Sequence, residues 1–199
     1  MSPITPSQTV GPFFAFGLTP HGQYDWKDTY TNNLVTPDAS GERIRIEGRV
    51  IDGDGRPIDD AMIEIWQADA SGRYAHPADQ RALPNAAFRG FGRAGTDRNG
   101  AFTFDTIKPG AVPGPDGGHQ APHIVIALFA RGMLRHCYTR LYFDDEVANA
   151  TDPILALVPP ERRPTLIARR QIRPGPDEAS IYLFDIRVQG DGETVFFDM

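Results

Sequence analysis

Two residues of the kind that bind transition metals stand without the neighbours that would complete a site. His123 lies in Ala121–Ile126, a run that predicts a β-strand. Residues two apart on a strand face the same way, so a histidine at 125 would give a two-ligand platform, but position 125 is Val. Tyr74 closes Glu64–Tyr74, where a predicted strand passes into a loop. A tyrosinate is a hard anionic oxygen donor that suits Fe³⁺.

Each of these two residues also has an ordinary structural reading. Tyr74 alone would be a packed or surface tyrosine, and His123 a hydrogen-bonded core histidine. Protein metal sites usually use three or four protein ligands. On the residues alone, two candidates therefore favour the structural readings over a metal site.

The composition indicates one turn-rich β domain. Of 199 residues, 20 are Gly and 18 are Pro, and 40% are apolar. This content suits many short strands around a real core. The net charge of −6 and the lack of a basic cluster argue against nucleic-acid binding.

Compartment and membrane contact also follow from composition. Cys137 is the only cysteine, so it can form no intrachain disulfide and a reducing, cytoplasmic setting is expected. No charged-then-apolar leader and no apolar run of membrane-spanning length is present, so no membrane contact is expected.

The expected fold is all-β: an antiparallel β-sandwich with long loops, an extended N-terminal arm and one or two short helices. Ile44, Ile46 and Val50 share one parity of a half-buried strand. His123–Ala130 is almost wholly apolar and is expected to be central. Asp152–Leu157 begins with an N-cap and a proline suited to a helix start. The other predicted strands are Ala61–Ala68, Ala101–Ile107, Cys137–Phe143, Ile181–Val188 and Thr194–Phe197.

The first forty residues differ from the rest. Residues 1–40 are irregular and rich in Pro, Gly and aromatic side chains that need burial. We expect this segment to be an arm that packs on a partner subunit, and residues 41–199 to form the sandwich domain.

Two other motifs carry less weight. Gly90–Gly95 matches the dinucleotide fingerprint literally, but a strand follows it instead of the helix that the mechanism needs. His136 and Cys137 are neighbours on a predicted strand, so their side chains point to opposite faces. Cys137 is read as a structural thiol.

Five segments resemble the intradiol ring-cleavage dioxygenases, whose ferric iron takes two tyrosines and two histidines. The first and last of these segments are typical of the iron-free α chain of two-chain members. The segments are Thr5–Phe13, Glu64–Tyr74, Ala121–Gly132, Thr139–Asp145 and Gly190–Phe197.

The resemblance implies which ligands are kept and which are lost. Tyr74 and His123 match ligand positions, while Val112 and Val125 fall where the second tyrosine and second histidine would be. No metal and no catalytic residue are therefore expected in this chain.

Substrate-binding residues are also carried over by resemblance. The arm would reach the partner's pocket and line it with Thr9, Gly11, Pro12 and Phe13. Arg131, at the end of an apolar strand, would offer a cation to an anionic catechol, although alone it reads equally as a solvated charge.

The function implied is that of a non-catalytic subunit. A homologous β chain would hold Fe(III), and an oligomer of αβ protomers would cleave 3,4-dihydroxybenzoate (protocatechuate) with O₂ to 3-carboxy-cis,cis-muconate in aromatic catabolism. A non-enzymatic β-sandwich binding or scaffold module that lost the chemistry stays open as the rival. A stand-alone dioxygenase fails on its ligand count.

Overall fold

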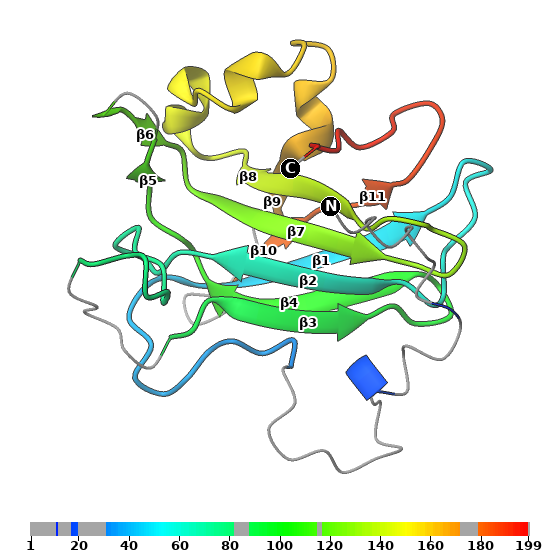
Figure 1. Cartoon of the computed structure of the whole chain (residues 1–199), viewed down its shortest axis with the longest axis horizontal. Helices are drawn as coiled ribbons and strands as arrows, with labels where there is room; N and C mark the ends of the chain where they lie inside the picture. Colours follow the sequence, from blue (N-terminus) through cyan, green and yellow to red (C-terminus); the bar gives the residue numbers. More distant parts are fainter. Residues whose placement is uncertain are drawn as a thin grey trace, which may run out of the picture.

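Eleven strands and three short 3₁₀ helices make up the regular part of the described chain (Figure 1). The computed structural model describes residues 11, 17–19, 31–81, 88–114, 117–171 and 179–198. No helix in these ranges is long and apolar enough to cross a bilayer. The elements in chain order are β1 (Arg43–Ile51), β2 (Met62–Gln67), β3 (Phe91–Gly95), β4 (Ala101–Ile107), β5 (Val112–Pro113), β6 (His119–Gln120), β7 (His123–Phe129), β8 (Cys137–Phe143), η2 (Val147–Thr151), η3 (Leu155–Leu157), η4 (Arg163–Leu166), β9 (Ile167–Gln171), β10 (Ser180–Leu183) and β11 (Ile186–Arg187).

The strands form two layers around one core. β1, β4, β10 and β11 make one layer, and β2, β3, β7 and β8 make the other. β9 pairs with β10 through Arg169–Gln171 and with β8 through Ile167 and Ala168, so it joins the layers along one side. Buried side chains from both layers, such as Phe104 and Ile126, share one cluster. The predicted all-β sandwich is confirmed.

The pairing of the strands is mixed. β1 runs parallel to β10 and β11, and β8 runs parallel to β9, while the other described pairings are antiparallel. The sandwich is therefore not wholly antiparallel. Gly48 permits the close approach of the β10–β11 segment to β1, because a Cβ there would lie 1.8 Å from the carbonyl oxygen of Phe184.

Several of the predicted strands are confirmed, while the expected strand Ile181–Val188 is divided into β10 and β11. Ile44, Ile46 and Val50 are each at most 2% exposed, as one inward-facing parity requires. β7 pairs with β2 on one side and β8 on the other, so it is central. Its central place explains why its sequence is almost wholly apolar.

Two predicted elements are shorter in the structure. Thr194–Phe197 forms no strand; Phe197 makes a single bridge to Tyr138. The helix expected at Asp152–Leu157 is the single 3₁₀ turn η3, because Pro159 and Pro160 force the preceding Val158 into an extended conformation. The short helices lie together above β8 in Figure 1.

The end of the predicted arm lies along this chain's own strands. The carbonyl of Thr31 accepts a hydrogen bond from the Arg93 amide at 3.0 Å, and Asn32 and Leu34 exchange backbone bonds with Asp105. Nearly all of residues 1–30 lie outside the described residues, so packing of the arm on a partner stays a prediction.

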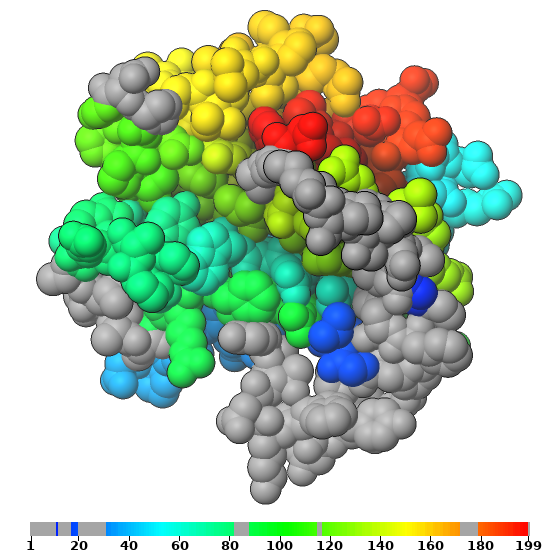
Figure 2. Space-filling view, in the orientation of Figure 1, coloured from blue at the N-terminus to red at the C-terminus, as the bar shows by residue number. Residues whose placement is uncertain are grey.

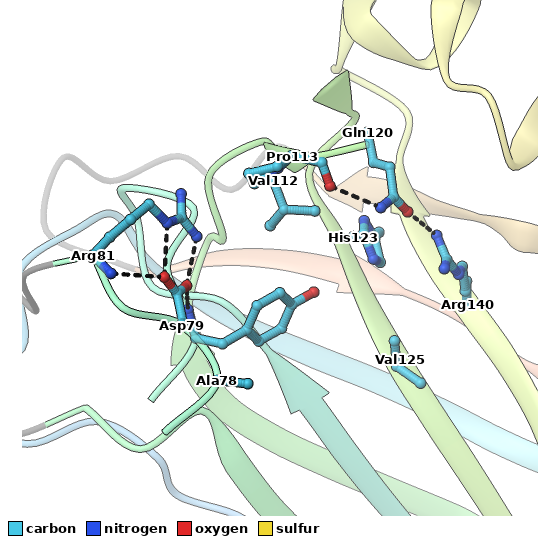
Figure 3. A pocket seen from close by; sticks show the side chains of 10 residues that line it. Ala78, Asp79, Arg81, Val112, Pro113, Gln120, His123, Val125 and Arg140 are labelled. Carbon is cyan, nitrogen blue, oxygen red and sulfur yellow. Dashed lines mark hydrogen bonds and ion pairs between the residues drawn. The ribbon is translucent and has the colours of Figure 1, made fainter. Parts of the chain in front are cut away.

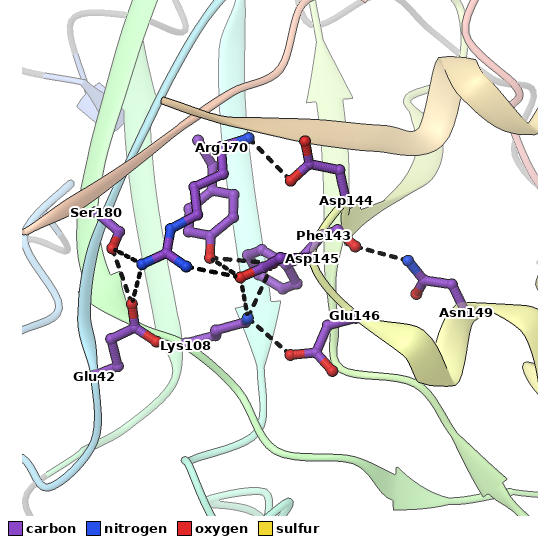
Figure 4. A network of polar contacts seen from close by, with 10 residues as sticks. Glu42, Lys108, Phe143, Asp144, Asp145, Glu146, Asn149, Arg170 and Ser180 are labelled. Carbon is purple, nitrogen blue, oxygen red and sulfur yellow. Dashed lines mark hydrogen bonds and ion pairs between the residues drawn. The ribbon is translucent and has the colours of Figure 1, made fainter. Parts of the chain in front are cut away.

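A polar network ties the ends of five strands together (Figure 4). Lys108, after β4, bonds Asp145 at 3.0 Å and Glu146 at 2.7 Å, both after β8. Arg170 of β9 reaches Asp145 at 3.3 Å and Glu42, before β1, at 3.6 Å. Burial opposes the Lys108 ammonium, but its bonds to Glu146 and Asp145 outweigh that cost and raise the pKa of Lys108.

We expect Lys108→Met to lower the free energy of unfolding by about 2 kcal/mol, because the half-buried Glu146 loses its cation and Asp145 keeps only Arg170. Arg56→Met is the matched control. Arg56 meets Asp54 at 3.8 Å with both side chains more than three-quarters exposed, so its loss should cost less than about 0.5 kcal/mol. Denaturant unfolding checks both variants, and equal losses would contradict this reading of the network.

Candidate functional site

A cavity of about 400 Å³ opens at the start of β7 (Figure 3). It draws its walls from the loop after β2, the β5–β6 hairpin, β7 and β8. In the space-filling view the teal loop borders the green hairpin at the left edge (Figure 2). The lining residues are Tyr74, Ala78, Asp79, Arg81, Val112, Pro113, Gln120, His123, Val125 and Arg140.

The loop after β2 is shaped by its own backbone contacts. The Asp69 carboxylate accepts the amides of Ser71 and Arg73 at 2.8 and 3.0 Å, which bends the chain sharply. Gly72 has φ +73° and lies against Ala111, whose carbonyl oxygen would be 1.8 Å from any Cβ. These contacts bring Tyr74 to the wall that carries Val112.

The cavity gathers the four positions that the resemblance singles out. Tyr74 and Val112 come from the loop and from β5, and His123 and Val125 stand two apart on β7. In the strand register Val125 faces Arg140 of β8 on one side and Trp66 of β2 on the other.

His123 is a buried, neutral imidazole. It is 3% exposed, and its Nδ1 lies 2.8 Å from the Ala121 carbonyl, which can only accept. Nδ1 therefore carries the proton and Nε2 is left as an acceptor. Burial, with help from the nearby Arg140 charge, lowers the pKa of His123 to about 4.

Tyr74 is held as a protonated phenol. Its ring stacks on Trp66 with centroids 5.8 Å apart and planes 12° apart. Burial raises the pKa of Tyr74, although the charges of Arg140 and Arg81 act in the opposite direction. Because the pKa of Tyr74 is raised, deprotonating it to a tyrosinate ligand would cost additional free energy.

The residues present do not fit a ferric ion. Val112 and Val125 offer no donor atom. Asp79 is held by Arg81 in a bidentate pair at 2.8 and 2.5 Å, and Gln120 accepts from Arg140 at 2.7 Å. Within the described ranges, no three His, Cys, Asp or Glu side chains are grouped as metal ligands would be. Two neutral donors facing two valines leave the charge of Fe³⁺ uncompensated.

Sequence reasoning missed the polar residues around the cavity. Arg140 lies within the resembling segment Thr139–Asp145, but the sequence predicts no role for it, nor for Asp79 or Arg81. A charged residue at the middle of a strand that pairs with a central apolar strand was the available signal for Arg140. No local sequence pattern predicts the ion pair between Asp79 and Arg81.

Of the other predicted site residues, the structure places Arg131 away from this cavity. Arg131 follows the far end of β7, with its side chain 61% exposed, 2.8 Å from Asp60 and 3.6 Å from Asp59. Gly11 has φ +74°. Thr9, Pro12 and Phe13 are outside the described residues. The roles given to these five residues stay predictions.

Comparison with known proteins places the chain in a family. A family model described as Dioxygenase matches residues 11–190. The protocatechuate 3,4-dioxygenase alpha chain of Burkholderia cepacia is 47% identical over 199 residues, covering 98% of this chain and 97% of the relative. The alpha chain of Pseudomonas putida is 49% identical over 202 residues, with 98% and 96% covered. The chain belongs to the intradiol dioxygenase family.

More distant relatives agree in sequence and fold. The beta chain from Burkholderia cepacia is 36% identical over 173 residues, covering 84% of this chain and 73% of that one. The dioxygenase domain of a carbohydrate-binding fusion protein from Streptomyces sp. SirexAA-E is 26% identical with TM-score 0.61, covering 94% and 99%. The fold also matches 3-chlorocatechol 1,2-dioxygenase from Rhodococcus opacus 1CP, with TM-score 0.64 over 78% of this chain and 63% of that one.

The buried neutral His123 predicts an acid-sensitive fold. Its pKa is about 4 folded and about 6.5 in the unfolded chain. Between pH 6.5 and pH 4 the unfolded chain therefore binds a proton at residue 123 that the folded chain does not bind. The contribution of His123 to stability is full above pH 6.5 and falls as the pH drops toward 4. Between pH 7 and 5 we expect His123 to account for a loss of about 2 kcal/mol.

The variant His123→Gln isolates this effect because it removes one titrating side chain and keeps all the others. Denaturant unfolding at pH 7 and pH 5 should show the smaller pH-dependent loss in the variant. Equal losses in both proteins would mean that His123 does not titrate as described.

Proposed function

We propose that this chain is the iron-free α subunit of a protocatechuate 3,4-dioxygenase. The observation that carries the proposal is Val112 and Val125 in one cavity with Tyr74 and His123. The relatives named as alpha chains are 47% and 49% identical, while the one named as a beta chain is 36% identical. The family is iron-dependent in general, so a chain with this cavity would take part in the reaction only beside another chain that holds the iron.

The proposed complex pairs this chain with a homologous β chain that holds Fe(III). Its reaction is the O₂-dependent cleavage of protocatechuate between the two hydroxylated carbons, giving 3-carboxy-cis,cis-muconate. The complex would work in the cytoplasm, where Cys137 stays reduced.

This chain's contribution would be a wall of the partner's pocket, built from Thr9, Gly11, Pro12 and Phe13, with Arg131 as a cation. Arg131 suits that role because its side chain is 61% exposed, so its guanidinium is accessible to a substrate carboxylate beside Asp59 and Asp60. Its guanidinium stays charged at any working pH.

The first test is co-expression with the candidate β chain. We expect the purified chain alone to hold no stoichiometric iron and no activity, and the co-purified complex to hold about one iron per αβ pair and to turn over protocatechuate. Metal analysis, visible absorption and O₂ uptake measure these outcomes. About one iron per chain in the isolated protein, with a tyrosinate-to-iron absorption band, would overturn the proposal.

The double variant Val112→Tyr with Val125→His sharpens this test. If the two valines prevent metal binding, the isolated variant should gain iron and a tyrosinate-to-iron band, because the cavity has room for the larger side chains. Identical iron content in the variant and the parent chain would show that other features of the loop exclude the metal.

The second test concerns Arg131. In the complex, Arg131→Ala should lower kcat/KM for protocatechuate by about five- to thirtyfold, mainly through KM. Catechol, which lacks the carboxylate, should be affected much less, and the visible spectrum should hardly change. Arg131→Lys is the control that keeps the charge and should recover part of the loss. Equal weakening of both substrates would make Arg131 a structural residue.

A further inference from the structure

The cavity that cannot hold iron still has the features of a binding site. It has a volume of about 400 Å³, within the range of small-molecule pockets. Its walls combine apolar side chains, Ala78, Val112, Pro113 and Val125, with polar groups that converge from other elements. The charges and side chains of these walls indicate the class of ligand that would bind.

The charges leave one cation uncompensated. Arg81 is neutralised by its bidentate pair with Asp79. Arg140 donates to Gln120 Oε1 at 2.7 Å and reaches the Tyr142 hydroxyl at 3.4 Å, and both of these partners are neutral. Across the ranges that the structure describes, Arg140 makes no ion pair with an acidic side chain.

The Arg140 charge acts on the cavity itself. It helps to lower the pKa of His123 and opposes the burial that raises the pKa values of Tyr74 and Tyr142. The one lining carboxylate, Asp79, is already paired with Arg81, and the buried Asp152 bonds the Tyr142 hydroxyl. A half-buried arginine in this state favours a carboxylate, which it can bind through two parallel hydrogen bonds.

The remaining walls offer apolar and aromatic contacts of the kind that suit an aromatic ring. Val112 and Val125 supply apolar contact, and the Tyr74 ring is fixed by its stacking on Trp66. The Tyr74 hydroxyl and His123 Nε2 offer one donor and one acceptor to a ring substituent. A purely aliphatic anion would leave these groups unused.

We propose that this cavity is a metal-free binding site for a small aromatic carboxylate, whose carboxylate pairs with Arg140 and whose ring packs against Tyr74, Val112 and Val125. The site belongs to this chain alone and does not require the proposed β chain. Occupancy would link the loop after β2, the β5–β6 hairpin, β7 and β8, and so would stabilise this end of the sandwich.

The test uses the isolated full-length chain, so binding at a partner's iron cannot contribute. Calorimetry with 4-hydroxybenzoate should give a dissociation constant below about 1 mM. The neutral analogue 4-hydroxybenzamide and the ringless anion acetate should each bind at least about tenfold more weakly. Equal binding of the amide would remove the role of Arg140, and equal binding of acetate would remove the role of the ring. Either result, or no binding of 4-hydroxybenzoate, overturns the proposal.

Variants locate the site. Arg140→Gln should weaken 4-hydroxybenzoate binding at least about tenfold, and Val125→Phe should do the same by filling the cavity. Arg169→Gln, which removes an exposed arginine of β9, is the matched charge control and should change affinity less than about twofold. Unaltered binding in Val125→Phe would place the ligand elsewhere. Because Arg140 also supports Gln120, unfolding curves accompany each variant, and the amide comparison on the parent chain needs no variant at all.

Discussion

One buried carboxylate holds the cavity end of the molecule together. Asp152 is 1% exposed, and its two oxygens accept from the Ala121 amide at 2.7 Å, the Tyr142 hydroxyl at 3.1 Å, and the amides of Ile154 and Leu155 at 3.0 and 2.6 Å. A buried carboxylate is tolerated only when it is fully hydrogen-bonded. The same contacts fix the entry to β7, the end of β8 and the start of η3.

The position of His123 depends on this arrangement. Ala121 gives its amide to Asp152 and its carbonyl to His123, so one residue connects the carboxylate to the imidazole. Tyr142 packs against the His123 ring with centroids 5.7 Å apart and also contacts Arg140. Protein hydrogen bonds and ring packing therefore hold His123 and Tyr142 in place at this end of the cavity.

The two ends of β7 lie near residues with different proposed roles. His123 begins the strand, whose seven residues span roughly 20 Å, and Arg131 lies two residues beyond its end at Phe129. The residue proposed to face the partner's pocket is therefore remote from the chain's own cavity.

The sequence could predict what local pattern controls. The parity of Ile44, Ile46 and Val50, and the apolar run of β7, follow from strand geometry and are observed. Asp152, which suggested a helix start, does accept the amides of Ile154 and Leu155. Its long-range bonds to Ala121 and Tyr142, and the bond from Arg140 to Gln120 twenty residues away, follow from no local pattern. The expected strand at Thr194–Phe197 failed because its alternating pattern finds only one bridging partner, Tyr138.

The central claim is that this chain carries the fold of the family without its iron. Anomalous X-ray scattering at the iron absorption edge, from crystals of the co-purified complex, tests it most directly. We expect one iron peak per pair of chains, within the partner, and none in the cavity lined by Tyr74 and His123. An iron peak within bonding distance of both Tyr74 and His123 of this chain would contradict it.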